Sequence, residues 1–317
     1  MQDQFSSSPE SPVLAIGAAC VDVIGRLRAE IHMGTSNPAQ IRSSPGGVAR
    51  NVAENLARLG QAVTLLSVIG EDENGSQLLQ RTIDAGVNVD YIARTSQHST
   101  GAYLGIINND GELQLAVDDM RALNLLTSEY IRRHTHLFDD ASLVFVDANL
   151  SKEALRTVIS LARKANLPIC ADPASLVLAA KLSPHLKQLA MITPNHAEAA
   201  LLAGQAFTAS RRKEAIQAAK NLVGQGVKIA IIALAEFGVC YATSETNGHV
   251  PAIRAAIIDP TGAGDALTAT VLFALLNDIP IDDAVRLGVA AASLTLGHPG
   301  AVWPELSLEK LYDHLAI

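Results

Sequence analysis

The chain has 317 residues, of which 49% are hydrophobic, and its 24 basic and 32 acidic side chains give a net charge of −8. This composition allows a large buried core and argues against a general nucleic-acid binder, which would present a basic surface. The three cysteines are widely spaced without zinc-ligand spacing, and no apolar run reaches transmembrane length. We therefore expect a cytoplasmic protein that binds neither a membrane nor a nucleic-acid polymer.

Strand-like and helix-like segments alternate along residues 13–317, after a polar stretch at residues 1–12 that we expect to be a disordered leader. Several predicted strands are apolar throughout, as expected where helices cover both faces of a sheet. The alternation predicts one α/β domain with a doubly wound, mostly parallel central sheet flanked by helices. The predicted strands are Val13–Gly17, Val63–Ile69, Leu143–Asp147, Pro168–Asp172, Met191–Thr193 and Lys228–Leu234, and the predicted helices are Val48–Leu59, Gly75–Ala85, Lys152–Ala165, Arg212–Val223, Ala266–Leu276 and Asp282–Leu296.

Two stretches interrupt this alternation. Residues 24–43 are irregular and polar, whereas residues 100–117 predict a hairpin, because an Asp-Gly turn at Asp110-Gly111 separates two apolar runs. A hairpin inserted between α/β units is a candidate lid that would shield a substrate from water. The alternative is an edge hairpin with no such role.

The segment Asp259–Asp265 has the sequence DPTGAGD and precedes an apolar helix. Gly262 and Gly264 let the backbone approach a ligand and point N–H groups toward it, at a helix N-terminus that favours an anion. A carboxylate at Asp265 would repel phosphate unless it takes a proton from an attacking hydroxyl while the amides hold the developing charge. The segment therefore predicts a phosphoryl-transfer site; a glycine-rich turn capped by Asp is the alternative.

A second glycine pair, Gly46-Gly47, precedes a helix that carries Asn51. The glycines allow close approach of a polyol, and the amide of Asn51 can donate and accept toward vicinal hydroxyls. Asp22 follows the first strand, at the edge of the sheet where α/β proteins bind ligands. These residues predict a sugar-binding group, against an ordinary helix start and a surface Asp.

Asn195 and Glu198 follow the strand that ends at Thr193. Their spacing fits a capping box at a helix N-terminus. The same pair lies on one helix face and could hold Mg²⁺ through water against a triphosphate, because Mg²⁺ keeps several waters. Both interpretations can hold together.

In order and spacing, these motifs resemble the ribokinase-like (PfkB-type) carbohydrate kinase family over nearly the whole chain. The resemblance implies a kinase that uses ATP and Mg²⁺, with residues about 24–43 and 100–117 forming a β-lid that often pairs between subunits as a homodimer. It implies that Asp265 deprotonates a primary hydroxyl beside an anion hole. The implied residues are Asp265, Gly262, Ala263 and Gly264 for catalysis; Asp22, Gly46, Gly47 and Asn51 for the sugar; Asn195, Thr261, Gly262, Gly264 and Gly238 for the nucleotide; Glu198 and Asn195 for Mg²⁺; and Asp259 as a candidate K⁺ ligand.

Within the family, residues 35–38, 118–120 and 146–151 resemble the pseudouridine kinases, which phosphorylate a 5′-hydroxyl. The resemblance implies that Ser36 and Asn37 read the uracil edge and that Asn149 binds substrate. A site built for such polar groups would penalise plain sugars. The alternative for residues 36–38 is a turn, since all three favour turns.

Other functions stay open. The acceptor could be ribose, fructose, a keto-deoxy sugar acid or another nucleoside, or the chain could be a non-catalytic nucleoside-binding sensor. Ala233 and Ala235 stand where the family usually has a small hydroxyl residue and a glycine. We therefore expect a raised ATP requirement rather than lost activity.

Overall fold

The computed structural model describes residue 5 and residues 11–315, so most of the leader predicted at residues 1–12 lies outside the described residues. Phe5 itself is 3% exposed and belongs to the same buried cluster as Val52 and Leu56. Farther along, the Pro12 carbonyl accepts a hydrogen bond of 2.9 Å from the Ser142 N–H, which ties the start of the domain to the central sheet.

In the described part of the chain, nine strands form one sheet in the order β13-β12-β11-β10-β9-β8-β1-β4-β5. Every pair from β5 to β11 is parallel, and only the β11–β12 and β12–β13 pairs are antiparallel. The predicted doubly wound, mostly parallel sheet is therefore confirmed. The strands are β1 (Val13–Ile16), β4 (Val63–Gly70), β5 (Ile92–Thr95), β8 (Leu143–Asp147), β9 (Ile169–Asp172), β10 (Met191–Ile192), β11 (Ile229–Ala233), β12 (Val239–Ala242) and β13 (Asn247–Val250).

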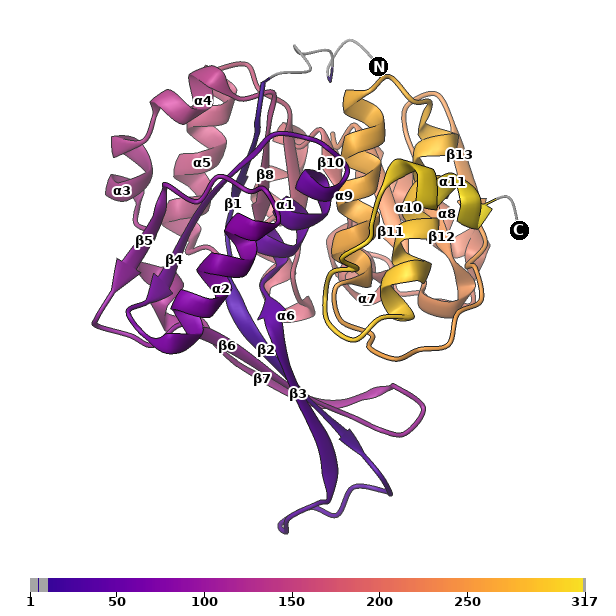
Figure 1. Ribbon diagram of the computed structural model, residues 1–317. Coiled ribbons are helices and arrows are strands. Elements are labelled where there is room, and N and C mark those ends of the chain that lie inside the picture. Colours follow the sequence, from indigo (N-terminus) through magenta and orange to yellow (C-terminus); the bar gives the residue numbers. More distant parts are fainter. Residues whose placement is uncertain (1–4, 6–10, 316–317) are drawn as a thin grey trace.

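Helices cover both faces of this sheet (Figure 1). One apolar cluster joins a face of the sheet to α1 (Val48–Arg58), α9 (Ala263–Leu276), α10 (Ile281–Leu296) and α11 (Leu308–Leu315). A second cluster covers the other face. Its helices are α3 (Ser128–Arg133), α4 (His136–Asp140), α5 (Lys152–Lys164), α6 (Leu176–Ala179), α7 (His196–Ala203) and α8 (Arg212–Gly224), and α2 (Glu73–Asp84) packs beside β4.

The start of α9 differs from the prediction. The helix was expected from Ala266, where the apolar run begins, but it starts at Ala263. The left-handed backbone of Gly262 (φ 75°) turns the chain directly into the helix, so polar and small residues form its first turn. Asp265 consequently lies inside the first turn of α9 instead of in the loop before it.

A second sheet of four strands, all within the described residues, projects from the body below α2 in Figure 1. Its order is β3-β2-β6-β7, from β2 (Cys20–Leu27), β3 (Ala39–Gly46), β6 (Gly101–Ile107) and β7 (Leu113–Asp119). The predicted hairpin is confirmed as the antiparallel pair β6–β7. Calling residues 24–43 irregular was wrong: β2 and β3 pair there. Much of β3 is exposed, so its apolar signal is weak.

The chain order reverses beside β1. From β1 the main sheet continues to β4 on one side, and later returns to β8 on the other. Such a reversal opens a crevice at the carboxyl ends of the strands, where ligands bind in open α/β sheets. No helix among the described residues is both long and apolar enough to cross a membrane.

Candidate active site

Asp22 and the glycine pair meet at this crevice. Asp22 lies in β2 and is 6% exposed. A Cβ built on Gly46 would lie 2.1 Å from the Asp22 carboxyl group. A Cβ built on Gly47, which has φ +93°, would lie 2.5 Å from the Ala18 carbonyl oxygen. Gly46 therefore lets the Asp22 carboxylate lie against the start of α1, and Gly47 lets the turn at Ala18 approach the same point.

Asn51 connects this corner to the phosphoryl-transfer loop. Its Nδ2 donates a hydrogen bond of 2.7 Å to Oδ2 of Asp265, a residue 214 positions away in sequence. Asn51 is 3% exposed and Asp265 is 9% exposed. The sequence motifs at the two ends of the chain therefore meet as one buried polar group between α1 and α9.

The N-terminus of α9 presents free backbone donors. No hydrogen-bond acceptor among the described residues faces the N–H groups of Ala263, Gly264 and Asp265, and Gly262 provides no side-chain cap. A Cβ on Gly262 would lie 1.9 Å from the Ala301 carbonyl oxygen, whereas one on Gly264 would meet nothing within 4 Å. The turn is thus packed from behind by residue 301 and open at Gly264, as an anion-binding helix N-terminus requires.

The carboxylates of this group titrate far from their ordinary range. The pKa of Asp265 is raised to about 7, chiefly by burial and in part by the charges of Asp22 and Asp147, against the opposing hydrogen bond from Asn51 and the charge of Arg50. Burial also raises the pKa of Asp22 to about 6. A carboxylate with a pKa near neutrality is well matched to accept a proton from an alcohol and release it later.

Asp147 lies at the same carboxyl edge of the main sheet, and the sequence motifs assigned it no role. It ends β8, is fully buried, and accepts hydrogen bonds from the N–H of Ala18 (2.8 Å) and of Ala49 (3.0 Å). It therefore holds the turn after β1 against the start of α1. The sequence feature that could have indicated Asp147 is a carboxylate at the end of an otherwise apolar strand. Asn149 donates its N–H to Asp147 at 2.9 Å, so it lies at the same edge.

A second missed carboxylate, Asp172, ends β9. Burial raises the pKa of Asp172, and the charges of Glu198 and Asp265 raise it further. Burial also raises the pKa of Glu198, in opposition to its bonds with Asn195. The predicted capping box is present: Asn195 Oδ1 accepts from the N–H of Glu198 at 3.0 Å, and Glu198 Oε2 accepts from the N–H of Asn195 at 2.8 Å.

These two carboxylates repel each other in a buried setting, which a cation between them would relieve. No cluster of three or more metal-ligating side chains occurs among the described residues. Mg²⁺ tolerates such a sparse site because it retains most of its waters. The donor set of Asp172, Glu198 and Asn195 therefore fits Mg²⁺ held largely through water.

Asp259 braces the phosphoryl-transfer loop from within. Its Oδ1 accepts from the N–H (3.0 Å) and the hydroxyl (2.5 Å) of Thr261, and its Oδ2 accepts from the Gly300 N–H at 3.1 Å. Both carboxylate oxygens already have protein donors. The structure assigns Asp259 a loop-bracing contact, and its role toward K⁺ stays a prediction.

The end of β11 and the turn after it carry the two alanines noted in the sequence. Ala235 begins a short 3₁₀ helix, η4 (Ala235–Phe237), with a left-handed φ of 51°. An L-residue in that region is strained, and a glycine is not. Gly238 follows with φ +91°, and a Cβ there would lie 2.2 Å from the Val250 carbonyl. Ala233 lies opposite Asn195 in an isolated bridge.

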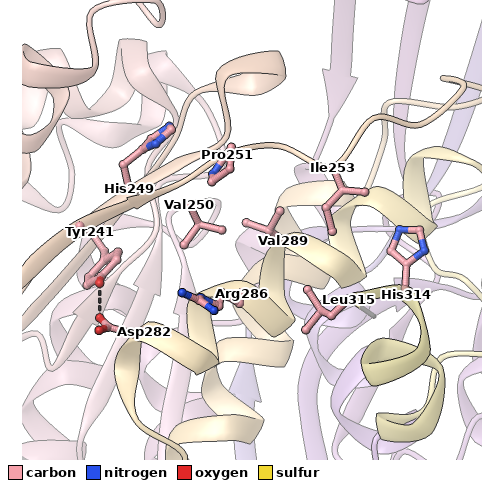
Figure 2. Close-up of a pocket in the computed structure, with 11 residues that line it drawn as sticks. Tyr241, His249, Val250, Pro251, Ile253, Asp282, Arg286, Val289, His314 and Leu315 are labelled. Atoms are coloured by element: carbon pink, nitrogen blue, oxygen red, sulfur yellow. Dashed lines mark hydrogen bonds between the residues drawn. The ribbon is translucent and has the colours of Figure 1, made fainter. Parts of the chain in front are cut away.

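A cavity of about 500 Å³ opens next to this loop, between β13 and α10 (Figure 2). Figure 2 shows apolar walls from Val250, Pro251, Ile253 and Val289, with His314 and Leu315 of α11 at one end. The cavity does not include Asp22 or Asp265.

Ser36 and Asn37 are not brought into this group. They lie in the loop between β2 and β3, at the far tip of the lid in Figure 1. Ser36 is exposed, and the Asn37 amide bonds within its own loop: Oδ1 accepts from the His32 N–H at 2.8 Å, and Nδ2 donates to the carbonyls of His32 (2.9 Å) and Thr35 (3.0 Å). These bonds are those of the alternative, a turn.

The same end of this second sheet is also attached to the body. Arg26 of β2 donates to the Asn109 carbonyl in the hairpin turn at 2.8 Å and to the Ile258 carbonyl at 2.6 Å. Ile258 immediately precedes Asp259, so the lid hairpin is linked to the segment that leads into the phosphoryl-transfer loop.

The sequence and the fold are those of a known kinase family. Residues 11–306 match the model of the pfkB family carbohydrate kinases. The chain belongs to this family, and the resemblance drawn from its motifs is confirmed.

Individual relatives are similar over most of the chain. Pseudouridine kinase of Escherichia coli K12 is 34% identical over 297 residues, covering 93% of this chain and 94% of that protein. Guanosine-inosine kinase of Exiguobacterium acetylicum is 29% identical over 283 residues, covering 89% of this chain and 93% of that protein. Arabidopsis thaliana ribokinase, solved with ribose and ATP, matches in fold with a TM-score of 0.80 at 22% identity, covering 97% of this chain and 99% of that one.

Proposed function

We propose that this kinase transfers the γ-phosphate of ATP to the 5′-hydroxyl of pseudouridine, giving pseudouridine 5′-phosphate and ADP (EC 2.7.1.83). One observation carries the chemistry: the Asp265 carboxylate lies at a helix N-terminus whose N–H groups have no acceptor in the described residues. The similarity to a pseudouridine kinase supports the choice of acceptor.

In this mechanism, Asp265 acts in its ionised form. It accepts the proton of the 5′-hydroxyl as the hydroxyl oxygen attacks the γ-phosphorus, and the bond from that phosphorus to the bridging oxygen breaks to release ADP. The N–H groups of Ala263 and Gly264 stabilise the charge on the transferred group. Asp22 accepts hydrogen bonds from two ribose hydroxyls, and Asn51 keeps Asp265 aimed at the third.

Glu198, Asn195 and Asp172 would hold Mg²⁺, mostly through water. When bound, the ion would neutralise phosphate charge during transfer. It would also lower the raised pKa values of Asp172 and Glu198, because a nearby cation favours the ionised carboxylates. Asp259 remains our candidate ligand for K⁺ beside the loop.

The cavity beside Gly238 would take the base of ATP. Its walls combine apolar side chains with Tyr241, Asp282 and Arg286, and its residue Val289 lies about two helical turns before the end of α10. That end is bonded to the phosphoryl-transfer segment, since the N–H of Ile258 donates to the Leu296 carbonyl at 2.8 Å. The base and the γ-phosphate would therefore lie along one groove.

The outer lid face would join two copies of the chain. Strand register aligns Ile41, Ile106 and Leu115 in one row, and Leu104 pairs with Val117 in the next. Leu115, Val117 and Ile41 are 48%, 57% and 70% exposed. An apolar sheet face of this kind favours association. Sedimentation of Leu115→Lys against the parent chain tests it: the proposal expects a dimer that dissociates in the variant.

The acceptor is tested by a kinase assay across pseudouridine, uridine, guanosine, ribose, fructose and a keto-deoxy sugar acid. We expect the highest kcat/KM with pseudouridine. If kcat/KM for pseudouridine is no higher than for ribose, pseudouridine is not the acceptor. Calorimetric binding of the nucleoside without ADP production would favour a sensor instead.

A further inference from the structure

Arg50 is a buried cation beside the proposed catalytic group. It is 1% exposed, and its Nε donates to the Gly46 carbonyl at 2.9 Å. One Nη donates to the Glu54 carboxylate, and the other donates to Oδ1 of Asn51. The guanidinium therefore contacts both the glycine turn that faces Asp22 and the amide that bonds Asp265.

The contact with Asn51 decides which end of the amide faces Asp265. A guanidinium has only hydrogen-bond donors, so the amide atom of Asn51 that faces it must be the acceptor, Oδ1. The amide nitrogen is thereby turned to Oδ2 of Asp265, where the hydrogen bond measures 2.7 Å. With the amide reversed, its oxygen would face the carboxylate and the two acceptors would repel.

Charge acts in the same direction. Carboxylates from three strands interact electrostatically with Asp265: Asp22 of β2 and Asp147 of β8 raise its pKa, and its charge in turn raises the pKa of Asp172 of β9. The Arg50 guanidinium, from α1, opposes them and lowers the pKa of Asp265. Glu54 and, beyond it, Arg58 hold Arg50 from the other side, with Arg58 Nη2 2.6 Å from Glu54 Oε1.

We propose that Arg50 is a positioning residue for phosphoryl transfer, which acts through Asn51 to keep the Asp265 carboxylate oriented and ionised. The inference rests on the proposed role of Asp265 as the base. Arg50 touches neither substrate in this mechanism.

The test is the pH profile of the single-turnover rate, measured by rapid quench with saturating Mg-ATP and pseudouridine or the best acceptor of the panel. In the parent chain the rate should fall on the acid side with a midpoint near 7, the pKa of Asp265. In Arg50→Met that midpoint should rise by about one pH unit, because an opposite charge and an oriented donor are lost. The rate at pH 7 should fall about fivefold, because the ionised fraction of Asp265 drops from about one half to about one tenth, and it should largely recover at pH 9.

Two companion variants keep the test decisive. Arg50→Met leaves the buried Glu54 with Arg58 as its remaining ion-pair partner, so Arg50→Met with Glu54→Met removes both members of the buried pair and guards against misfolding. It should show the same raised midpoint. Arg58→Met is the matched control: it also removes a guanidinium from Glu54 but does not touch Asn51, and its midpoint should match the parent.

The outcomes distinguish the role of Arg50 from the role of Asp265. A parent profile with an acid limb that neither Arg50 variant moves, or a rate loss equal at every pH, overturns the role of Arg50 alone. A parent rate without an acid limb, with Asp265→Asn still active, overturns the proposed base and hence the mechanism itself.

Discussion

The body of the molecule and the tip of its lid hold their candidate substrate contacts in different ways. In the body, Asp22, Asn51 and Asp265 are at most 9% exposed, and Asn51 is bonded to Asp265. At the lid tip, Ser36 is exposed and the Asn37 amide is occupied by its own loop. The difference shows that the three core side chains are held in place by the folded body. If Ser36 and Asn37 read a base, as proposed, their loop must first rearrange.

Removing a contact from the preorganised side should have the largest effect. Asp22→Ala deletes two hydrogen bonds from a charged group to the ribose, each worth about 1.5–3 kcal/mol, so kcat/KM should fall by about 10²–10⁴-fold. Steady-state kinetics with pseudouridine and with ribose should show similar losses, because both acceptors share the ribose hydroxyls. A loss below tenfold would mean that Asp22 does not contact the sugar.

Preorganisation should also cost stability. The folded pKa of Asp265 is about 7, above its ordinary 3.8, so the folded state binds this proton more tightly than the unfolded state does. Protonated Asp265 therefore favours folding at low pH, and the unfolding free energy falls as the pH rises from the ordinary pKa through the folded pKa. Asp265→Asn should therefore raise the unfolding free energy at pH 8 by about 2–4 kcal/mol, and by less at pH 5.5. Denaturant melts at the two pH values measure this. Equal gains at both would contradict the pKa.

A change on the lid side should be smaller and selective. Ser36→Ala removes a hydroxyl that makes no bond in the described structure, so the loop should be unaffected. If Ser36 reads the uracil edge, KM for pseudouridine should rise about tenfold, the cost of one hydrogen bond, while KM for ribose stays unchanged. Asn37→Ala is the companion that also loosens the loop. Equal changes for both acceptors would show that the tip supports the fold of the lid and reads no base.

The smallest effect is expected at the nucleotide loop. Ala235→Gly relieves a left-handed backbone at φ 51°, worth about 1 kcal/mol, and opens room for the donor. KM for ATP should fall by about two- to fivefold with kcat unchanged. An unchanged or higher KM would mean that the alanine methyl does not hinder the nucleotide.

How much the sequence foretold follows the same division. Asp22, Gly46, Gly47, Asn51 and Asp265 were predicted because glycines and polar residues stand out against apolar strands and helices. Other parts depended on contacts made only in the folded chain.

Asp147, Asp172 and Arg50 gave weak signals, since their partners come from distant elements and burial alone gives them their properties. The lid strand β3 was missed because its exposed residues lack an apolar pattern. Whether Asn37 faces a ligand or its own loop cannot be read from a turn sequence, because both arrangements use the same residue types.

The central claim is that Asp265 removes the proton from the acceptor hydroxyl. The most direct measurement is the single-turnover transfer rate of Asp265→Asn at pH 8, with calorimetry of nucleoside binding on the same sample. We predict a rate reduced by about 10²–10⁴-fold with binding retained, since general bases contribute in that range. A rate within a few-fold of the parent chain would contradict the account.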